Sequence, residues 1–126
     1  MKTQRLIQIG GLINLLFVAF HLLSAWTPGL ELLLPDFRPV MQVLNIHLAY
    51  ALAIFFAVSV FFPGELSATK LGRLISLSIA GFWILRGLNQ LLFWGVAPAS
   101  WVILLVCIGI GMLYIIPVTA RHALAN

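Results

Sequence analysis

The chain has 126 residues, of which 63% are hydrophobic and 8% are charged. Soluble domains are about 45–50% apolar and about 25% charged, so this chain has too little polar surface to cover a water-soluble globule. Seven Lys and Arg against three Asp and Glu give a net charge of +4, but the cations stand in ones and twos between apolar runs, which is typical of membrane topology and excludes nucleic-acid binding. The composition therefore predicts an integral membrane protein.

Four apolar segments of about 20 residues follow one another, and this length crosses a hydrocarbon core of about 30 Å. They cover residues 6–26, 40–62, 74–94 and 99–118. The breaks between them carry proline, glycine or both, as at Pro63-Gly64. The runs lack the alternation of barrel strands. We expect an all-α fold, a four-helix transmembrane bundle that forms one domain over residues 1–126.

The first segment has a second interpretation, a cleaved signal peptide. Lys2 and Arg5 fit the charged start of such a peptide, and Leu23-Ser24-Ala25 loosely resembles a cleavage site. The apolar run is longer than usual for a signal peptide and contains Asn14 and His21. We therefore expect a retained helix.

The cations predict the orientation in the membrane. If the segments alternate in direction, five cations share one side of the membrane: Lys2, Arg5, Lys70, Arg73 and Arg121. Arg38 alone falls on the other side. The positive-inside rule then places both termini in the cytoplasm, and a bacterial inner (plasma) membrane is the expected location. Three tryptophans would lie at the outer interface: Trp26, Trp94 and Trp101.

Polar side chains within the spans are the candidate functional residues, because such groups are rare in lipid unless they meet one another, water or a ligand. Antiparallel segments collect seven of them in one layer about 4–14 Å below the outer interface. They are His21, Gln42, Asn45, His47, Arg86, Asn89 and Gln90. We expect them to line an outward-facing ligand pocket. No comparable cluster is expected in the inner half, which contains Asn14, Ser59, Ser76, Ser78 and Tyr114.

Arg86 has two interpretations. A cation at a helix centre costs about 2.5–3.5 kcal/mol on insertion scales, and none of the spans contains an Asp or Glu to neutralise it. Its long side chain can extend outward to lipid phosphate or to Glu31 or Asp36, which would be a structural role. Alternatively, it anchors an anionic or carbonyl-bearing ligand, with Asn89 and Gln90 as neutral donors.

The histidines in the spans leave three interpretations open. His21 and His47 can bond amides or backbone carbonyls between helices. They can ligate a b-type haem, since they come from different segments at similar depth. They can also relay protons. We expect no catalytic site and no metal site, because the spans contain neither paired carboxylates nor a Cys–His pair at similar depth, and the lone Cys107 excludes an intramolecular disulfide.

Three functions follow from these residues. The first is binding or passage of a small anionic, carbonyl-bearing or lipid-like ligand through a polar pocket in the outer, periplasmic half of the bundle. The alternative is a structural or accessory subunit of a larger membrane complex or a homo-oligomer, docked through a ridge of Ala49, Ala53 and Ala57. The second alternative is a haem-binding membrane protein. The expected surroundings are the lipid bilayer in every case.

Overall fold

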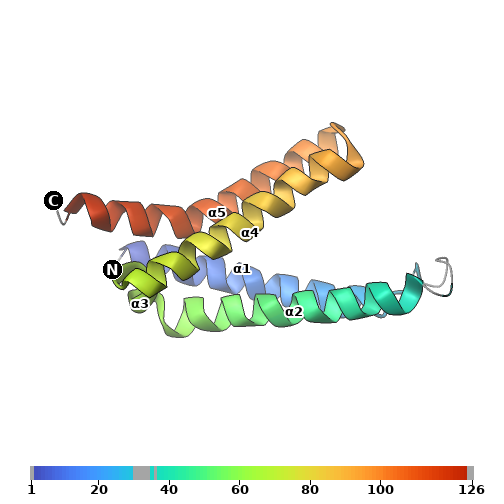
Figure 1. Ribbon diagram of the computed structural model, residues 1–126, viewed down its shortest axis with the longest axis horizontal. Helices are drawn as coiled ribbons and strands as arrows, with labels where there is room; N and C mark the ends of the chain where they lie inside the picture. Colours follow the sequence, from blue (N-terminus) through green and yellow to red (C-terminus); the bar gives the residue numbers. More distant parts are fainter. Residues whose placement is uncertain (1, 30–34, 36, 125–126) are drawn as a thin grey trace.

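The computed structural model describes residues 2–29, 35 and 37–124, and the regular structure of these residues is helical without a strand. The helices are α1 (Lys2–Ser24), α2 (Phe37–Phe61), α3 (Pro63–Ala68), α4 (Lys70–Trp94) and α5 (Pro98–Leu124) (Figure 1). The four long helices are long and apolar enough to cross a membrane. The prediction of an all-α fold with four helices that can span a membrane is thereby confirmed. Glu31 and Asp36, proposed above as partners of Arg86, lie outside the described residues.

The short helix α3 was not expected, because Pro63-Gly64 was interpreted as a break. Proline fits the first turn of a helix, where its missing N–H is not needed, so Pro63 starts α3 instead of only ending α2. Thr69 then separates α3 from α4, and its Oγ1 accepts a hydrogen bond of 2.9 Å from the backbone N–H of Gly72. At the other end of α4, Gly95 adopts a φ of 73°, which favours glycine, and Pro98 begins α5.

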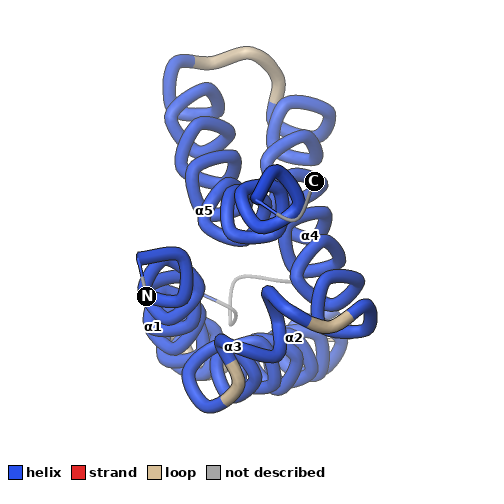
Figure 2. Tube along the Cα trace, turned by 90° about the vertical axis from the view of Figure 1, so that its left-hand side faces the viewer, coloured by secondary structure: helices blue, strands red, loops and turns tan. Residues whose placement is uncertain are grey.

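The long helices form two antiparallel hairpins, α1 with α2 and α4 with α5. Figure 1 shows the hairpins together where α1 begins and α5 ends, and separated where α1 and α4 end. We call these the closed end and the open end. The two hairpins touch mainly through α1 and α5, and α3 contacts both of them at the closed end. Figure 2 looks along the molecule from the closed end and shows the two hairpins as separate pairs.

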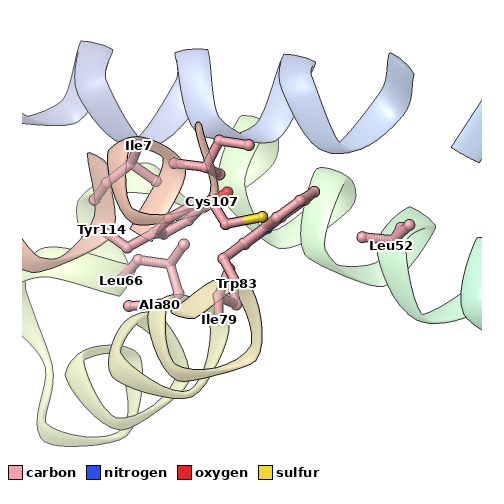
Figure 3. Packing of buried hydrophobic residues seen from close by; sticks show 9 residues of the cluster. Ile7, Leu52, Leu66, Ile79, Ala80, Trp83, Cys107 and Tyr114 are labelled. Atoms are coloured by element: carbon pink, nitrogen blue, oxygen red, sulfur yellow. The ribbon is translucent and has the colours of Figure 1, made fainter. Parts of the chain in front are cut away.

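The apolar core lies toward the closed end and draws on all five helices (Figure 3). Its buried members are Ile7, Leu52, Leu66, Ile79, Ala80, Trp83, Cys107, Ile110 and Tyr114. Glycine allows close packing at several points, including two that face side chains of α5. A Cβ at Gly10 would come within 2.7 Å of the Tyr114 ring, and a Cβ at Gly87 within 2.9 Å of Leu104. Close backbone approach of this kind is how helices associate in lipid, where the surrounding solvent is as apolar as the side chains.

Helix α5 changes direction between its two halves (Figure 1). It contains Pro117, which lacks the N–H that would bond the carbonyl four residues earlier. It also contains Gly109 and Gly111, which are further residues that permit a bend. The bend lets the closed-end half of α5 pack against α1 while its open-end half follows α4 away from the other hairpin.

Candidate functional site

A fully buried polar network joins the four long helices next to the core. Asn14 of α1 donates from Nδ2 to the Tyr114 hydroxyl of α5 and to the Gly10 carbonyl, both at 2.9 Å. Its Oδ1 accepts from the Trp83 Nε1–H of α4 at 3.1 Å. The Tyr114 hydroxyl also bonds Ser59 Oγ of α2 at 2.9 Å. Every side chain of the network is therefore paired within the protein.

This network corrects the expectation that the inner half holds no polar cluster. Asn14, Ser59 and Tyr114 are each 0% exposed, and Trp83 is 3% exposed. The sequence reasoning did not single out Trp83. The signal was present: a tryptophan buried in a span needs an acceptor for its N–H, and Asn14 is a suitable one.

Aromatic side chains connect the two hairpins one turn further toward the open end. The rings of Phe17 in α1 and Trp83 in α4 have centroids 4.7 Å apart, and those of Phe55 in α2 and Phe82 in α4 are 5.3 Å apart. Both pairs meet edge to face, which is a favourable arrangement of aromatic quadrupoles. Three of these rings, Phe17, Phe82 and Trp83, line the floor of the space that opens between the hairpins, and we call this space the interhairpin cleft.

Arg86 stands directly above this floor and lines three cavities of the cleft. One cavity of about 720 Å³ lies between α2 and α4. A second of about 260 Å³ lies among α1, α4 and α5. A third of about 70 Å³ lies among α1, α2 and α4. Among the residues that line these three cavities, Arg86 is the only one of the types Lys, Arg, Asp and Glu. Most of the other lining residues are apolar or aromatic.

The guanidinium of Arg86 turns toward the open end. Nη1 donates to Gln90 Oε1 at 3.0 Å, and Cζ lies 5.9 Å from the centroid of the Trp94 ring, within cation–π range. Both partners are neutral. Within the described part of the chain the one carboxylate is Glu65, which belongs to α3 at the closed end. Arg86 thus has no described counter-ion and retains N–H groups that a ligand can use.

The two histidines differ in their surroundings. His21 is half-buried, and its Nδ1 bonds Asn45 Oδ1 across α1 and α2 at 2.8 Å. His47 is exposed, and its Nδ1 bonds the Val43 carbonyl of its own helix at 2.8 Å. The bond to a backbone carbonyl requires Nδ1–H as the donor on His47. Both rings therefore use Nδ1 inside the protein and keep Nε2 for another partner.

The seven candidate residues fall into one connected group with one exception. Arg86, His47 and Asn89 line the largest cavity, and His21 lines the smallest with Arg86. Gln90 is 8% exposed and joins the group through its bond to Arg86, as Asn45 does through His21. Gln42 is half-buried and lines none of the three cavities. The cleft residues that the sequence reasoning did not select are the apolar ones, such as Phe17 and Phe20.

The structure places His21 and His47 on different cavities, so haem ligation by this pair stays a prediction. Within the described residues, no group of three or more His, Cys, Asp or Glu is placed to hold a metal ion. Of the alanine ridge, Ala49 is 2% exposed and buried within the chain, while Ala53 and Ala57 are half-buried. The ridge is therefore partly covered by the protein itself.

Comparison of the chain with protein-family models, with curated proteins and with solved structures gave no match.

Proposed function

We propose that this protein binds a small amphiphile with an anionic or carbonyl-bearing head in the interhairpin cleft. The observation that carries the proposal is the position of Arg86, a cation without a described counter-ion at the junction of three mostly apolar cavities. A guanidinium recognises carboxylate and phosphate oxygens through paired, charge-assisted hydrogen bonds. The apolar walls around it suit a hydrocarbon chain.

Charge complementarity favours an anionic head over a neutral one. Arg86 lies eight residues before Trp94, or about 12 Å along α4 from its open end. A positive charge at that depth is costly in lipid, and the neutral Gln90 and Trp94 compensate only part of the cost. A bound anion would cancel the charge and fill the cleft at the same time. Asn89, which lines the same cavity, adds an uncharged donor.

The proposal includes a bacterial inner membrane with both termini in the cytoplasm and the open end facing outward. Arg5, Lys70 and Arg73 belong to the closed-end parts of α1 and α4, whereas Arg38 starts α2 at the open end. The positive-inside rule assigns the cation-rich end to the cytoplasm. At the open end, exposed tryptophans form the aromatic belt of a membrane interface: Trp26, Trp94 and Trp101. A reporter fused to either terminus tests this orientation, and periplasmic reporter activity would contradict it.

The binding test compares ligand-dependent stabilisation in the wild type and in Arg86→Gln. The protein is purified in a neutral detergent and its unfolding is followed with oleate, monoolein or neither. A ligand at 100 times its Kd stabilises a protein by about 2.7 kcal/mol. We expect oleate to stabilise the wild type and to have little effect on Arg86→Gln. Stabilisation by monoolein that also depends on Arg86 would identify the carbonyl as the recognised group.

Arg73→Gln is the matched control, because it removes an equal charge from the closed end of α4. It should respond to oleate as the wild type does. Without ligand, Arg86→Gln should unfold close to the wild type, since the side chain is exposed and its partners are neutral. Equal stabilisation of the wild type and Arg86→Gln by both amphiphiles would show that the proposal is wrong.

A further inference from the structure

Two apolar cavities flank Arg86, and they lie on different sides of the cleft. The cavity of about 720 Å³ is walled by Leu44, Leu48 and Ala51 of α2 on the side opposite α4. The cavity of about 260 Å³ is walled by Val102, Ile103 and Val106 of α5, with Phe17 and Phe20 of α1. The first thus reaches out between α2 and α4, and the second between α1 and α5. We call them the α2 cavity and the α5 cavity.

The cleft-facing side of α4 accounts for this division. Arg86 lines both cavities. Of its neighbours on α4, Asn89 lines the α2 cavity but not the α5 cavity, and Trp83 lines the α5 cavity but not the α2 cavity. At 100° per residue, Asn89 and Trp83 lie about 60° to either side of Arg86 on the helix. The narrow cavity of about 70 Å³ also includes Arg86 and touches both sides through Leu48 and Phe17. The two apolar spaces therefore meet at the guanidinium.

Both cavities open toward the hydrocarbon layer. Their lining includes side chains that are more than half exposed, Leu44 and Phe93 in the α2 cavity and Phe20 and Val102 in the α5 cavity. These residues belong to helices that are long and apolar enough to cross a membrane, so their exposed surfaces would face lipid. A hydrocarbon chain can leave each cavity sideways without meeting water. A ligand with a single hydrocarbon chain would fill one of these cavities and leave the other one empty.

We infer that the ligand is a two-chained anionic membrane lipid whose phosphate meets Arg86 and whose chains leave through the α2 cavity and the α5 cavity. This inference rests on the proposed function and deepens it. A phosphate accepts two parallel N–H bonds from one guanidinium, and Gln90 occupies only one of the five N–H groups of Arg86. The larger α2 cavity, which also contains His47 and Asn89, has room for polar parts of the headgroup beside its chain.

The test obstructs one cavity at a time and compares lipids that differ by one chain. Ala51→Phe places a ring in the α2 cavity, and Val106→Phe places one in the α5 cavity. Binding of phosphatidylglycerol and of its single-chain lyso form is measured by native mass spectrometry from detergent. The matched controls are Ile54→Phe in α2 and Leu105→Phe in α5, which add a ring at exposed positions outside the three cavities.

We expect each cavity variant to weaken phosphatidylglycerol at least about tenfold relative to the lyso lipid, because the single chain can use the cavity that stays open. The controls should bind both lipids as the wild type does. If either cavity variant weakens both lipids equally, or weakens neither, the two-chain inference is wrong. That result would leave the proposed function intact as long as binding of the lyso lipid still depends on Arg86. If lyso-lipid binding is unchanged in Arg86→Gln, the proposed function fails instead.

Discussion

Replacement of Asn14 by leucine tests the buried polar network most directly. The amide is 0% exposed and makes hydrogen bonds to two other helices, to Tyr114 and to Trp83. Leucine has a similar size but neither donates nor accepts. The substitution therefore removes both interhelical bonds, and it leaves the Trp83 N–H buried without an acceptor.

The expected loss of stability follows from these two effects. Hydrogen bonds between membrane helices contribute about 0.6 kcal/mol on average. An unpaired buried donor adds about 1–3 kcal/mol. Asn14→Leu should therefore lower the free energy of unfolding by about 2–4 kcal/mol. Tyr114→Phe also breaks two interhelical bonds. It leaves one of the two N–H groups of Asn14 Nδ2 buried without an acceptor, so it should also cost about 2–4 kcal/mol.

Equilibrium unfolding in mixed micelles with increasing dodecyl sulfate measures these differences. Asn45→Leu is the matched control, since its amide also bonds its own helix and one neighbour, His21, but lies at a half-buried site where the released groups can be solvated. We expect that control to lose about 0.6 kcal/mol. The reasoning is refuted if either Asn14→Leu or Tyr114→Phe costs no more than Asn45→Leu.

Two further predictions address the packing of α4 on α5 and the histidines. Gly87→Leu should destabilise the protein by about 1–3 kcal/mol in the same unfolding assay, because its Cβ would press on Leu104 and Cys107. Gly81→Leu, whose Cβ meets no atom within 4 Å, is its control and should change stability little, so equal losses would contradict the packing argument. If His21 and His47 ligate haem, the protein purified after haem supplementation should show a Soret band that His21→Leu abolishes, and a flat spectrum of the wild type would exclude this function.

The number and approximate limits of the spans could be predicted from the sequence because length and hydropathy are sufficient for them. The separation of the two hairpins at the open end could not be predicted from the sequence, because it depends on which helix faces contact each other. The small helix α3 shows a related limit. Pro63-Gly64 is compatible with a loop and with a first helical turn, and contacts of α3 with both hairpins decide between them.

For the candidate site, depth along the helices was enough to group Arg86 with His47, Asn89 and Gln90. Depth carries no information about direction around the helix axis, so Gln42 was included although it lines no cavity of the cleft. The same limit hid the buried polar network. Asn14 and Tyr114 are separated by 100 positions in the chain, and their contact depends on the bend of α5 and on the absence of a side chain at Gly10.

One face of α4 explains why the hairpins join at one end and separate at the other. Toward the closed end this face carries Ile79 and Trp83, which are buried, and the one polar atom of the Trp83 side chain is paired with Asn14. Contact between hairpins is favourable there because nothing is left unsatisfied. One turn later the face carries Arg86, and no described carboxylate lies near it. Closing the hairpins over a cation that has no described counter-ion would cost several kcal/mol, so the contact ends at the aromatic floor and the cleft begins at Arg86.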